Sequence, residues 1–364
     1  MTLQLRAYQR AAIDAIYAYY EKHSGNALIC IPTAGGKSAV MAAFIQEVLA
    51  QWPDERIIIL THVRELISQN FAELIRLWPE APAGIYSAGL NRRDVQAQIL
   101  FAGIQSVHRK AYAIQRADLV LVDEAHLVPG QANATYRRLL RDLTRINPHL
   151  KTIGLTATPY RLDSGMLHTG PDSLFDDIAF EVSVRELIDQ GYLAPLISKQ
   201  TSTQLDVSGV ATRGGEFIAG QLEAAVDQDP VTQAAIDEVV AYGRDRRSWL
   251  LFCAGVDHAC HVSEAVRARG VSCATIFGHT AKTERDRIIT AFKRGEVRAL
   301  ASMGVLTTGF NAPAVDLIAM LRPTKSTGLY VQMAGRGTRL APGKDNCLVL
   351  DFAATSPATG RSTW

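Results

Sequence analysis

The stretch that most constrains the fold is residues 27–40, A-L-I-C-I-P-T-A-G-G-K-S-A-V. An apolar run breaks into a glycine-rich turn ending at Gly36, Lys37 and Ser38, and small helix-compatible residues follow. This is the layout of a phosphate-binding loop, whose backbone N–H groups and helix N-terminus meet a phosphate. Lys37 would reach the phosphates and the Ser38 hydroxyl could bind Mg²⁺. Ile31 replaces the first glycine of the pattern G-x-x-x-x-G-K-[ST], so this stretch alone also fits an ordinary strand-to-helix turn.

The composition is that of a globular chain long enough for two domains. It has 364 residues, of which 48% are hydrophobic and 20% charged. No apolar run approaches the roughly 18 residues of a membrane span, and the N-terminus lacks a signal-peptide core, so we expect a cytoplasmic protein without a membrane partner. The five cysteines form no C-x-x-C pair, and the net charge of +2 means that any polyanion site must be local.

Polar residues follow apolar runs at several points of the first 160 or so residues. Such runs at 56–61, 100–104, 118–122 and 153–155 alternate with helix-compatible segments, which predicts a mostly parallel sheet. Ligands of open α/β sheets bind where the strands end. The small polar pair Gln105 and Ser106 falls at one such point.

A pair of acids, Asp123 and Glu124, follows another of these runs. Adjacent acids on a loop are usually only solvated. Here they come directly after a buried strand and about ninety residues beyond Lys37, which favours a functional role beside the phosphate-binding loop.

The pattern loosens after Arg161 and becomes regular again near Trp249. We therefore expect a first α/β domain at 1–178, a linker or accessory segment at 179–228 and a second α/β domain at 229–364. Strands are predicted at 249–253, 271–277, 298–303, 315–321 and 347–352, and helices at 258–269, 284–293 and 327–335.

Two arginines near the end of the second domain are candidates for a catalytic role. Gln332 and Arg336 are four residues apart, which places them on one face of a helix, and Arg339 follows three residues later. The flanking Gly335 and Gly337 would permit a close backbone approach. A solvated basic turn is the simpler alternative.

Eight segments, taken in order, resemble motifs Q, I, Ia, Ic, II, III, V and VI of the superfamily 2 (DEAD/DEAH-box) helicases. They are 5–9, 32–38, 61–66, 105–106, 123–126, 156–158, 306–313 and 332–339. Longer strings, such as T-A-T-P-Y-R-L-D from Thr156 and Y-V-Q-M-A-G-R-G-T-R from Tyr330, resemble the bacterial RadD-type DNA-repair helicases over nearly the whole chain.

The resemblance implies two tandem RecA-like domains, parallel sheets flanked by helices, with an ATP cleft between them. ATP and Mg²⁺ would be the cofactors. Ser38 and Asp123 would hold the metal, partly through water, and Glu124 would activate the attacking water. Arg336, Arg339 and Gln332 would act across the cleft, with Lys37 on the phosphates. The nucleotide-binding residues would be Arg6, Gln9, Thr33, Ala34, Gly35, Gly36, Lys37, Ser38, Gly309 and Asn311, in which the Gln9 amide would bond adenine and favour ATP over GTP.

The resemblance also implies a nucleic-acid partner, expected to be single-stranded or branched DNA, with repair proteins as further partners. The residues that touch it, mostly at phosphates, would be Arg64, Gln105, Ser106, His279 and Thr307. His126, Thr156 and Thr158 would couple ATP chemistry to domain movement. Two departures matter: Asn311 stands where the family usually has an Asp, and the sequence to Trp364 does not include the family's cysteine-bearing, zinc-binding C-terminal region.

We therefore expect an ATP-dependent DNA helicase or translocase that acts in repair or recombination. A nucleic-acid-stimulated ATPase that remodels or anneals DNA or RNA strands without unwinding them is the alternative. A non-catalytic ATP-gated clamp is disfavoured, because Glu124, Arg336 and Arg339 are all present.

Overall fold

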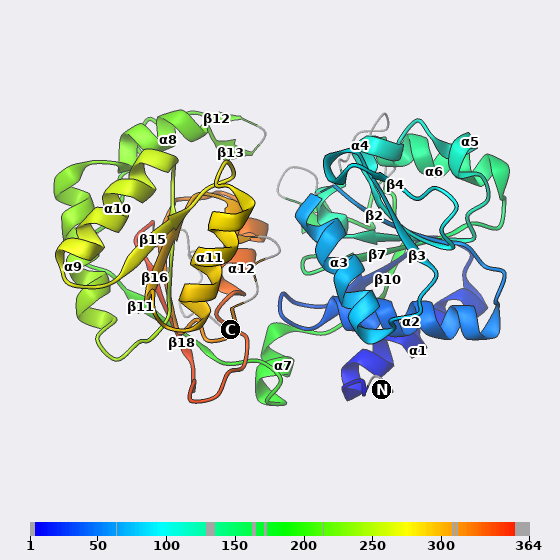
Figure 1. Cartoon of the computed structure of the whole chain (residues 1–364), viewed down its shortest axis with the longest axis horizontal. Coiled ribbons are helices and arrows are strands. Elements are labelled where there is room, and N and C mark those ends of the chain that lie inside the picture. The colour runs from blue at the N-terminus through cyan, green and yellow to red at the C-terminus, as the bar shows by residue number, and fades with distance from the viewer. Residues whose placement is uncertain are drawn as a thin grey trace. The chain divides into compact units, whose positions relative to one another are not determined.

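The computed structural model of the chain describes residues 4–62, 64–128, 135–161, 165–170, 173–213, 215–307, 310 and 312–353. The chain divides into two compact units, Met1–Ser183 and Val184–Trp364. Each unit contains one large sheet between layers of helices (Figure 1). Among the helices that the structure describes, none is long and apolar enough to cross a membrane.

The first unit is built on an eight-stranded sheet with the order β10-β1-β7-β6-β2-β5-β3-β4. Neighbouring strands are parallel, except that β4 runs antiparallel to β3. The strands are β1 (Ala27–Cys30), β2 (Ile57–Thr61), β3 (Ala83–Ser87), β4 (Arg92–Arg93), β5 (Ile99–Gly103), β6 (Leu119–Asp123), β7 (Lys151–Thr156) and β10 (Asp177–Glu181). A separate small hairpin consists of β8 (Tyr160–Arg161) and β9 (Gly165–Met166).

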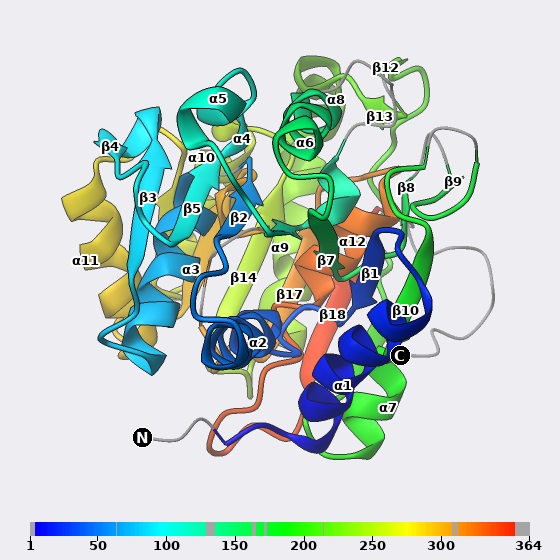
Figure 2. The same cartoon turned by 90° about the vertical axis from the view of Figure 1, so that its right-hand side faces the viewer.

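Helices cover both faces of this sheet. They are α1 (Ala7–Lys22), α2 (Lys37–Gln51), α3 (Arg64–Leu77), α4 (Ile104–Val107), α5 (Ala111–Ile114) and α6 (Thr135–Ile146), with short 3₁₀ turns η1 (Ala88–Leu90) and η2 (Ala125–Leu127). Even-numbered residues of the central strands, such as Leu28, Ile58 and Val120, pack with residues of α4, α5 and α6. Their odd-numbered neighbours are also buried, under α1, α2 and α3 on the other face (Figure 2). Burial on both faces is the reason that these strands read as continuous apolar runs.

The second unit repeats this layering on a six-stranded, fully parallel sheet with the order β11-β18-β17-β14-β16-β15. The strands are β11 (Leu196–Gln200), β14 (Trp249–Cys253), β15 (Cys273–Ile276), β16 (Ala299–Ser302), β17 (Leu317–Leu321) and β18 (Cys347–Asp351). The helices are α7 (Val184–Asp189), α8 (Ala219–Val226), α9 (Asp229–Tyr242), α10 (Val256–Ala268), α11 (Lys282–Lys293) and α12 (Thr327–Ala334), with the 3₁₀ turn η3 (Val305–Thr307).

The two faces of the second sheet have separate cores. Trp249 and Leu251 of β14 pack with residues of α8, α9 and α10, whereas Leu250 and Phe252 pack with residues of α11 and α12. The prediction of α/β units with mostly parallel sheets is therefore confirmed.

The segment 179–228 contains three complete strands and two helices, α7 and α8, that sequence periodicity does not indicate. β11 pairs with β18, and α8 contacts α10. A small hairpin of β12 (Thr212–Arg213) and β13 (Glu216–Phe217) reaches α12, because Glu216 accepts hydrogen bonds from the backbone N–H groups of Lys325 (3.2 Å) and Ser326 (3.3 Å).

Gly154, in the central strand β7, marks a tight contact of the first core. A Cβ added there would lie 2.6 Å from two ring atoms of the buried Phe175 and 2.8 Å from Cδ1 of Leu28. Rigid ring atoms at that distance must move to make room for the added atom.

We predict that Gly154→Ala lowers the free energy of unfolding by about 1–3 kcal/mol, measured by urea denaturation, because it overpacks the core. Gly220→Ala is the control, since no atom lies within 4 Å of a Cβ added there and the position is helical. It should leave stability unchanged or raise it by up to about 1 kcal/mol. Equal stabilities of the two variants would show that the contact at Gly154 relaxes freely.

Candidate functional site

The loop of residues 31–36 carries the chain from β1 into α2. The N–H of Ile31 donates to the carbonyl of Thr156 at 2.9 Å, so the sheet pairing extends one residue beyond β1. This explains an apolar residue where the general pattern has glycine, because Ile31 is fully buried. The chain then turns, with φ of 68° at Ala34 and 79° at Gly36. A left-handed conformation suits glycine at Gly36, directly before the helix begins at Lys37.

Lys37 lies between this loop and the acids at the end of β6. Its Nζ is 3.4 Å from the carbonyl oxygen of Ile31 and 3.8 Å from Oε1 of Glu124. The structure thus brings Lys37 and Glu124 together at the edge of the sheet where the parallel strands β1 and β6 end, with β7 between them. Glu124 adopts a left-handed conformation with φ of 51°, which is uncommon for a residue with a side chain.

Asn70 connects Ser38 with Asp123, and the sequence analysis did not identify it. Its Nδ2 donates to Oδ2 of Asp123 at 2.6 Å, and its Oδ1 accepts from the Ser38 hydroxyl at 3.2 Å. One buried amide therefore orients both a carboxylate and a hydroxyl. The sequence does contain a signal that could have identified Asn70. It is a polar residue on the apolar face of α3, where Leu66, Ile67 and Leu74 are also buried.

The carboxyl group of Asp123 has an unusual environment. Burial, and then the charge of Glu124, raise its pKa to about 6, although Lys37 and Asn70 act in the opposite direction. Its Oδ1 also accepts the backbone N–H of Glu124 at 2.9 Å. Two neighbouring acids at the end of a buried strand are thus held by one ammonium group, one amide and one N–H group.

A chain of polar groups runs from Glu124 to the end of β7. Nδ1 of His126 is 3.5 Å from Oε2 of Glu124 and 3.0 Å from the hydroxyl of Thr156. That hydroxyl donates to the carbonyl of Thr158 at 2.8 Å and accepts the N–H of Thr158 at 3.1 Å. Because the single hydroxyl proton is used on Thr158, we assign the proton between His126 and Thr156 to Nδ1.

The start of α1 is tied to the phosphate-loop backbone. The carbonyl of Gly35 accepts hydrogen bonds from the Tyr8 hydroxyl at 2.6 Å and from Nε2 of Gln9 at 3.3 Å. Oε1 of Gln9 accepts the backbone N–H of Arg6 at 3.0 Å. Both polar ends of Gln9, the residue assigned to adenine, thus bind the chain itself, and a Cβ on Gly36 would lie 2.5 Å from Nε2 of Gln9. Thr33 is half-buried in the same loop.

The candidate nucleic-acid residues of the first unit gather around η1. The N–H of Ala88 donates to the Ser106 hydroxyl at 2.9 Å, and Nη1 of the exposed Arg64 is 3.5 Å from the carbonyl of Gly89. Gln105, exposed on α4, precedes Ser106. The structure thus brings these three residues to one rim, together with the loop after β3, which sequence reasoning did not single out.

In the second unit, the placement of Arg336 on a helix face was wrong. Helix α12 ends at Ala334, so Gln332 is helical, while Arg336 and Arg339 lie in the turn that follows. The turn packs closely on β18, because a Cβ on Gly337 would lie 2.4 Å from Sγ of Cys347. This contact takes the backbone off the helical path.

Arg336 is buried, and Arg339 is partly buried. Arg336 is only 6% exposed, and its Nη1 donates to the carbonyl of Phe310 at 2.8 Å. Burial lowers the pKa of Arg339, and its Nη1 has no hydrogen-bond partner among the residues that the structure describes.

Lys344 holds the turn that carries these arginines, and it too was missed. Its Nζ donates to the carbonyls of Gly337 and Arg339, both at 2.7 Å, and to the carbonyl of Pro313 at 3.2 Å. Burial lowers the pKa of Lys344 to about 8. Three carbonyls thus share one ammonium group.

The remaining predicted residues are more dispersed or fall outside the description. His279 is exposed beyond β15, with its ring stacked on that of Phe277 at a centroid distance of 5.4 Å. Gly309 and Asn311 lie outside the described residues, as does the side chain of Thr307.

Comparisons with known proteins match each half of the chain to a family model. Residues 2–161 match the model described as "Type III restriction enzyme, res subunit", and residues 232–341 match "Helicase conserved C-terminal domain". A Saccharomyces cerevisiae protein named "Putative ATP-dependent helicase IRC3" is 28% identical over 97% of this chain and 52% of its own length. The two matched domains are those of superfamily 2 helicases. These are ATP-hydrolysing enzymes, as the resemblance of the motifs implied.

Solved structures agree on the fold of this chain, which is two RecA-like domains in tandem. A fragment of an HsdR subunit of a type I restriction enzyme from Vibrio vulnificus superposes with a TM-score of 0.71 at 21% identity, over 97% of this chain and 64% of that one. The type ISP restriction-modification enzyme LlaBIII, bound to DNA, superposes with a TM-score of 0.67 at 16% identity, over 96% and 28%. The chain spans about half the length of the curated helicase relatives that it matches.

The oxygen atoms beside the phosphate loop fit Mg²⁺. The Ser38 hydroxyl and the Asp123 carboxylate are linked through Asn70, and magnesium prefers oxygen ligands. Within the described part of the chain, no three His, Cys, Asp or Glu residues cluster as a metal cage. Magnesium needs none, because it takes most of its ligands from water and phosphates.

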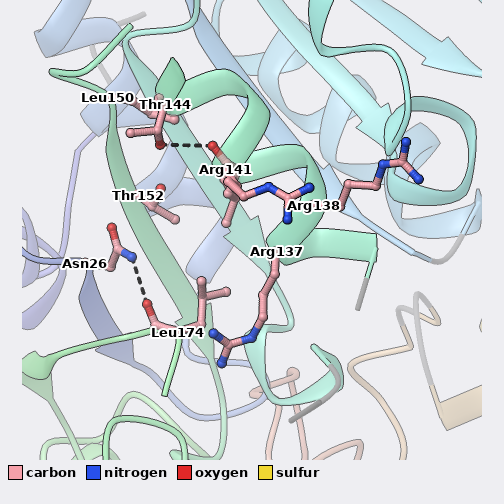
Figure 3. A pocket seen from close by; sticks show the side chains of 9 residues that line it. Asn26, Arg137, Arg138, Arg141, Thr144, Leu150, Thr152 and Leu174 are labelled. Atoms are coloured by element: carbon pink, nitrogen blue, oxygen red, sulfur yellow. Dashed lines mark hydrogen bonds between the residues drawn. The ribbon is translucent and has the colours of Figure 1, made fainter. Parts of the chain in front are cut away.

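A basic pocket of about 570 Å³ on α6 is separate from the helicase motifs (Figure 3). None of the predicted site residues lines it. Three arginines of α6 share the single carboxylate of Asp142, from Arg141 at 3.4 Å, Arg145 at 3.6 Å and Arg138 at 4.0 Å. Part of the charge of α6 is therefore already compensated within the helix.

We predict that Asn70→Ala raises the Mg²⁺ concentration for half-maximal ATP turnover by about 10- to 100-fold, as loss of an outer-shell partner of a metal ligand does. Gln69→Ala, on the exposed side of the same helix, should leave it within about twofold. Nucleotide binding without Mg²⁺ should be similar in both variants. If Asn70→Ala keeps the normal Mg²⁺ dependence, the amide does not orient the metal ligands.

Proposed function

We propose that this chain couples ATP hydrolysis to movement on, or remodelling of, DNA. The observation that carries the proposal is the group of Lys37, Ser38, Asn70, Asp123 and Glu124, which brings a phosphate-binding cation, oxygen ligands for Mg²⁺ and a base to one point. The proposal is supported by the name of a relative, an ATP-dependent helicase, and by a structural neighbour, a restriction-modification enzyme bound to DNA.

The chemistry would be in-line attack of water on the γ-phosphate of ATP. Lys37 would hold the β- and γ-phosphates, and Ser38 and Asp123 would hold Mg²⁺, which neutralises charge on the phosphates when bound. Glu124 would orient the water and accept its proton. The contact of Glu124 with His126 supports a route by which the γ-phosphate would be sensed at Thr156 and Thr158.

Nucleic acid would lie on the rim around η1, at Arg64, Gln105 and Ser106. A guanidinium group, an amide and a hydroxyl suit phosphate and sugar contacts, which position a strand without reading its sequence. DNA, single-stranded or branched, is the proposed polymer. The strings shared with RadD-type proteins support a role in repair or recombination, with repair proteins as partners.

We predict that ATP turnover is stimulated by single-stranded or forked DNA, and less by RNA. Lys37→Ala should abolish turnover, whereas Glu124→Gln should bind ATP but lower kcat by about 10²- to 10⁴-fold, the usual contribution of a general base. Lys22→Ala and Glu80→Gln, at exposed positions, are the matched controls.

Steady-state turnover and ATP binding measure these effects, and displacement of a labelled strand from a fork separates unwinding from translocation or annealing. Normal turnover by Lys37→Ala would exclude the proposed chemistry. Full ATP binding without turnover in the unchanged protein, with every polymer, would instead identify an ATP-gated clamp.

Arg336 and Arg339 are proposed to stabilise the charge that develops on the γ-phosphate. Such arginines contribute about 10³- to 10⁵-fold in rate in comparable enzymes. The Arg339 Nη1 without a described partner supports this role, because a buried cationic N–H group without an acceptor is costly. Lys344 would position the turn that carries both arginines.

We predict that Lys344→Met lowers kcat more than it raises KM for ATP, because the carbonyls of Gly337 and Arg339 lose their donor. Lys293→Met, exposed at the end of α11, is the control. Lys344→Arg should keep most of the activity that Lys344→Met loses.

The pH profile of kcat separates this role from a general loss of structure. The charged or titratable groups that face Lys344 are Asp316 and Cys347, which raise its pKa, and Arg339, which lowers it, but burial dominates and lowers the pKa to about 8. Lys344 is therefore charged below this pH and loses a donor above it. Wild-type kcat should fall above about pH 8, and the fall should shift to higher pH in Lys344→Arg, because an arginine stays charged. Identical profiles would contradict the positioning role.

A further inference from the structure

The basic pocket on α6 has three cations in its walls. Arg137, Arg138 and Arg141 line it from the helix, and Leu174, on the segment that leads to β10, also lines it (Figure 3). No aspartate or glutamate is among the described residues that line the pocket. The helix itself carries four arginines against one aspartate, which leaves α6 with a net charge of +3. A hollow of about 570 Å³ with this lining attracts anions.

The neutral polar side chains of the pocket already have partners within the chain. Nδ2 of Asn26 donates to the carbonyl of Leu174 at 2.8 Å, and the Thr144 hydroxyl donates to the carbonyl of Leu140 at 2.9 Å. The pocket therefore offers a ligand mainly its guanidinium groups.

Arg137 is the arginine whose charge is least compensated. Arg138 and Arg141 share the carboxylate of Asp142, in which Arg137 takes no part. Nε of Arg137 is buried and has no hydrogen-bond partner among the residues that the structure describes. A buried N–H group of a cation is costly without an acceptor, so this position favours an anionic ligand.

The directions of the three side chains favour an extended anion over a small one. The guanidinium group of Arg137 points away from that of Arg138, and that of Arg141 lies between them in this view (Figure 3). A single small anion would need groups that converge. Arg137 and Arg141 are one helical turn apart, a rise of about 6 Å, which corresponds to about two nucleotide steps of roughly 3.4 Å along one strand. They can therefore bind neighbouring phosphates.

The pocket and the rim around η1 lie on different sides of α6. Asn26 and Thr152 place the pocket at β1 and β7, toward one end of the sheet. Helix α4, which carries Gln105 and Ser106, contacts β3 and β5 toward the other end. A helix with its side chains is about 10–12 Å wide. A short strand on the rim would not reach the pocket, whereas a second arm of a branched polymer would.

We propose that the basic pocket on α6 binds the phosphate backbone of the duplex arm of branched DNA, while the rim around η1 holds a single strand. This inference rests on the proposed function, which assigns the rim to nucleic acid, and it adds a site outside the helicase motifs.

The lining of the pocket favours a duplex over a second single strand. Proteins hold single strands largely by stacking bases on aromatic rings, and no aromatic side chain is among the described residues that line the pocket. A duplex presents one phosphate for about every 1.7 Å of its axis, and guanidinium groups bind phosphates without access to the bases.

The salt dependence of binding to a fluorescein-labelled forked DNA tests the proposal. Arg137→Ala and Arg141→Ala should each lower the log–log salt slope by about 0.9, the value for one phosphate contact on B-DNA, and the double variant by about 1.8. Arg137→Lys and Arg141→Lys keep the charge and should keep the slope. Arg141 is exposed, so its variants test the proposal even if Arg137→Ala fails to fold, which thermal unfolding would reveal.

Two controls separate the pocket from the general charge of the helix. Arg145→Ala removes an arginine from the same helix that also shares Asp142 but does not line the pocket, and it should leave the slope unchanged. A short oligothymidylate has no duplex arm, so the pocket variants should bind it within about twofold of the unchanged protein.

Several results would overturn the inference. They are an unchanged slope on the fork in both alanine variants, an equal fall in Arg145→Ala, or an equal fall on oligothymidylate. Loss of polyglutamate binding in the variants, with the slope on the fork retained, would instead assign the pocket to an acidic protein. A wild-type chain that binds neither DNA would refute the proposed function itself, whereas normal binding of oligothymidylate with any of the first three results refutes the pocket alone.

Discussion

The carboxyl group of Asp123 is buried at the end of β6, directly beside a second acid, and the surrounding structure compensates for that arrangement. Burial, and then the neighbouring charge of Glu124, favour its neutral form and raise its pKa to about 6. Lys37, Asn70 and the N–H of Glu124 approach it from three different segments. The phosphate loop, α3 and the left-handed turn at Glu124 must therefore all be in place before this point of the molecule is stable. The same groups that stabilise the acids leave them able to receive a divalent cation.

The fold could be predicted from the sequence largely because its strands are buried on both faces. Continuous apolar runs at β2, β6 and β14 have few other interpretations, and each is followed by residues that turn the chain. The edge strands are different. β11 is mostly exposed, so its sequence has no apolar run, and only its pairing with β18 makes it a strand.

A site residue could be predicted from the sequence where its residue type, at that place in the pattern, has a single common chemical use. The glycines before Lys37 and the acids at the end of β6 are such cases. Asn70 and Lys344 are not, because their roles depend on partners far along the chain: Ser38 and Asp123 for one, and backbone carbonyls for the other. A backbone carbonyl leaves no trace in a sequence, and a mid-helix Asn has no preferred partner. Arg336 was wrongly placed on the helix face for a related reason, since the turn that carries it packs at Gly337 on Cys347 of β18.

The pairing of β11 with β18 has a consequence for how the chain is made. The first strand of the second sheet joins the last one, about 150 residues later, so its hydrogen-bonding edge has no partner until nearly all of the second unit has left the ribosome. The first unit can close its own sheet once β10 has been synthesised. Vectorial synthesis therefore favours an early first unit and a late second one, and the interval is when the nascent chain exposes an unpaired strand and most needs protection from aggregation.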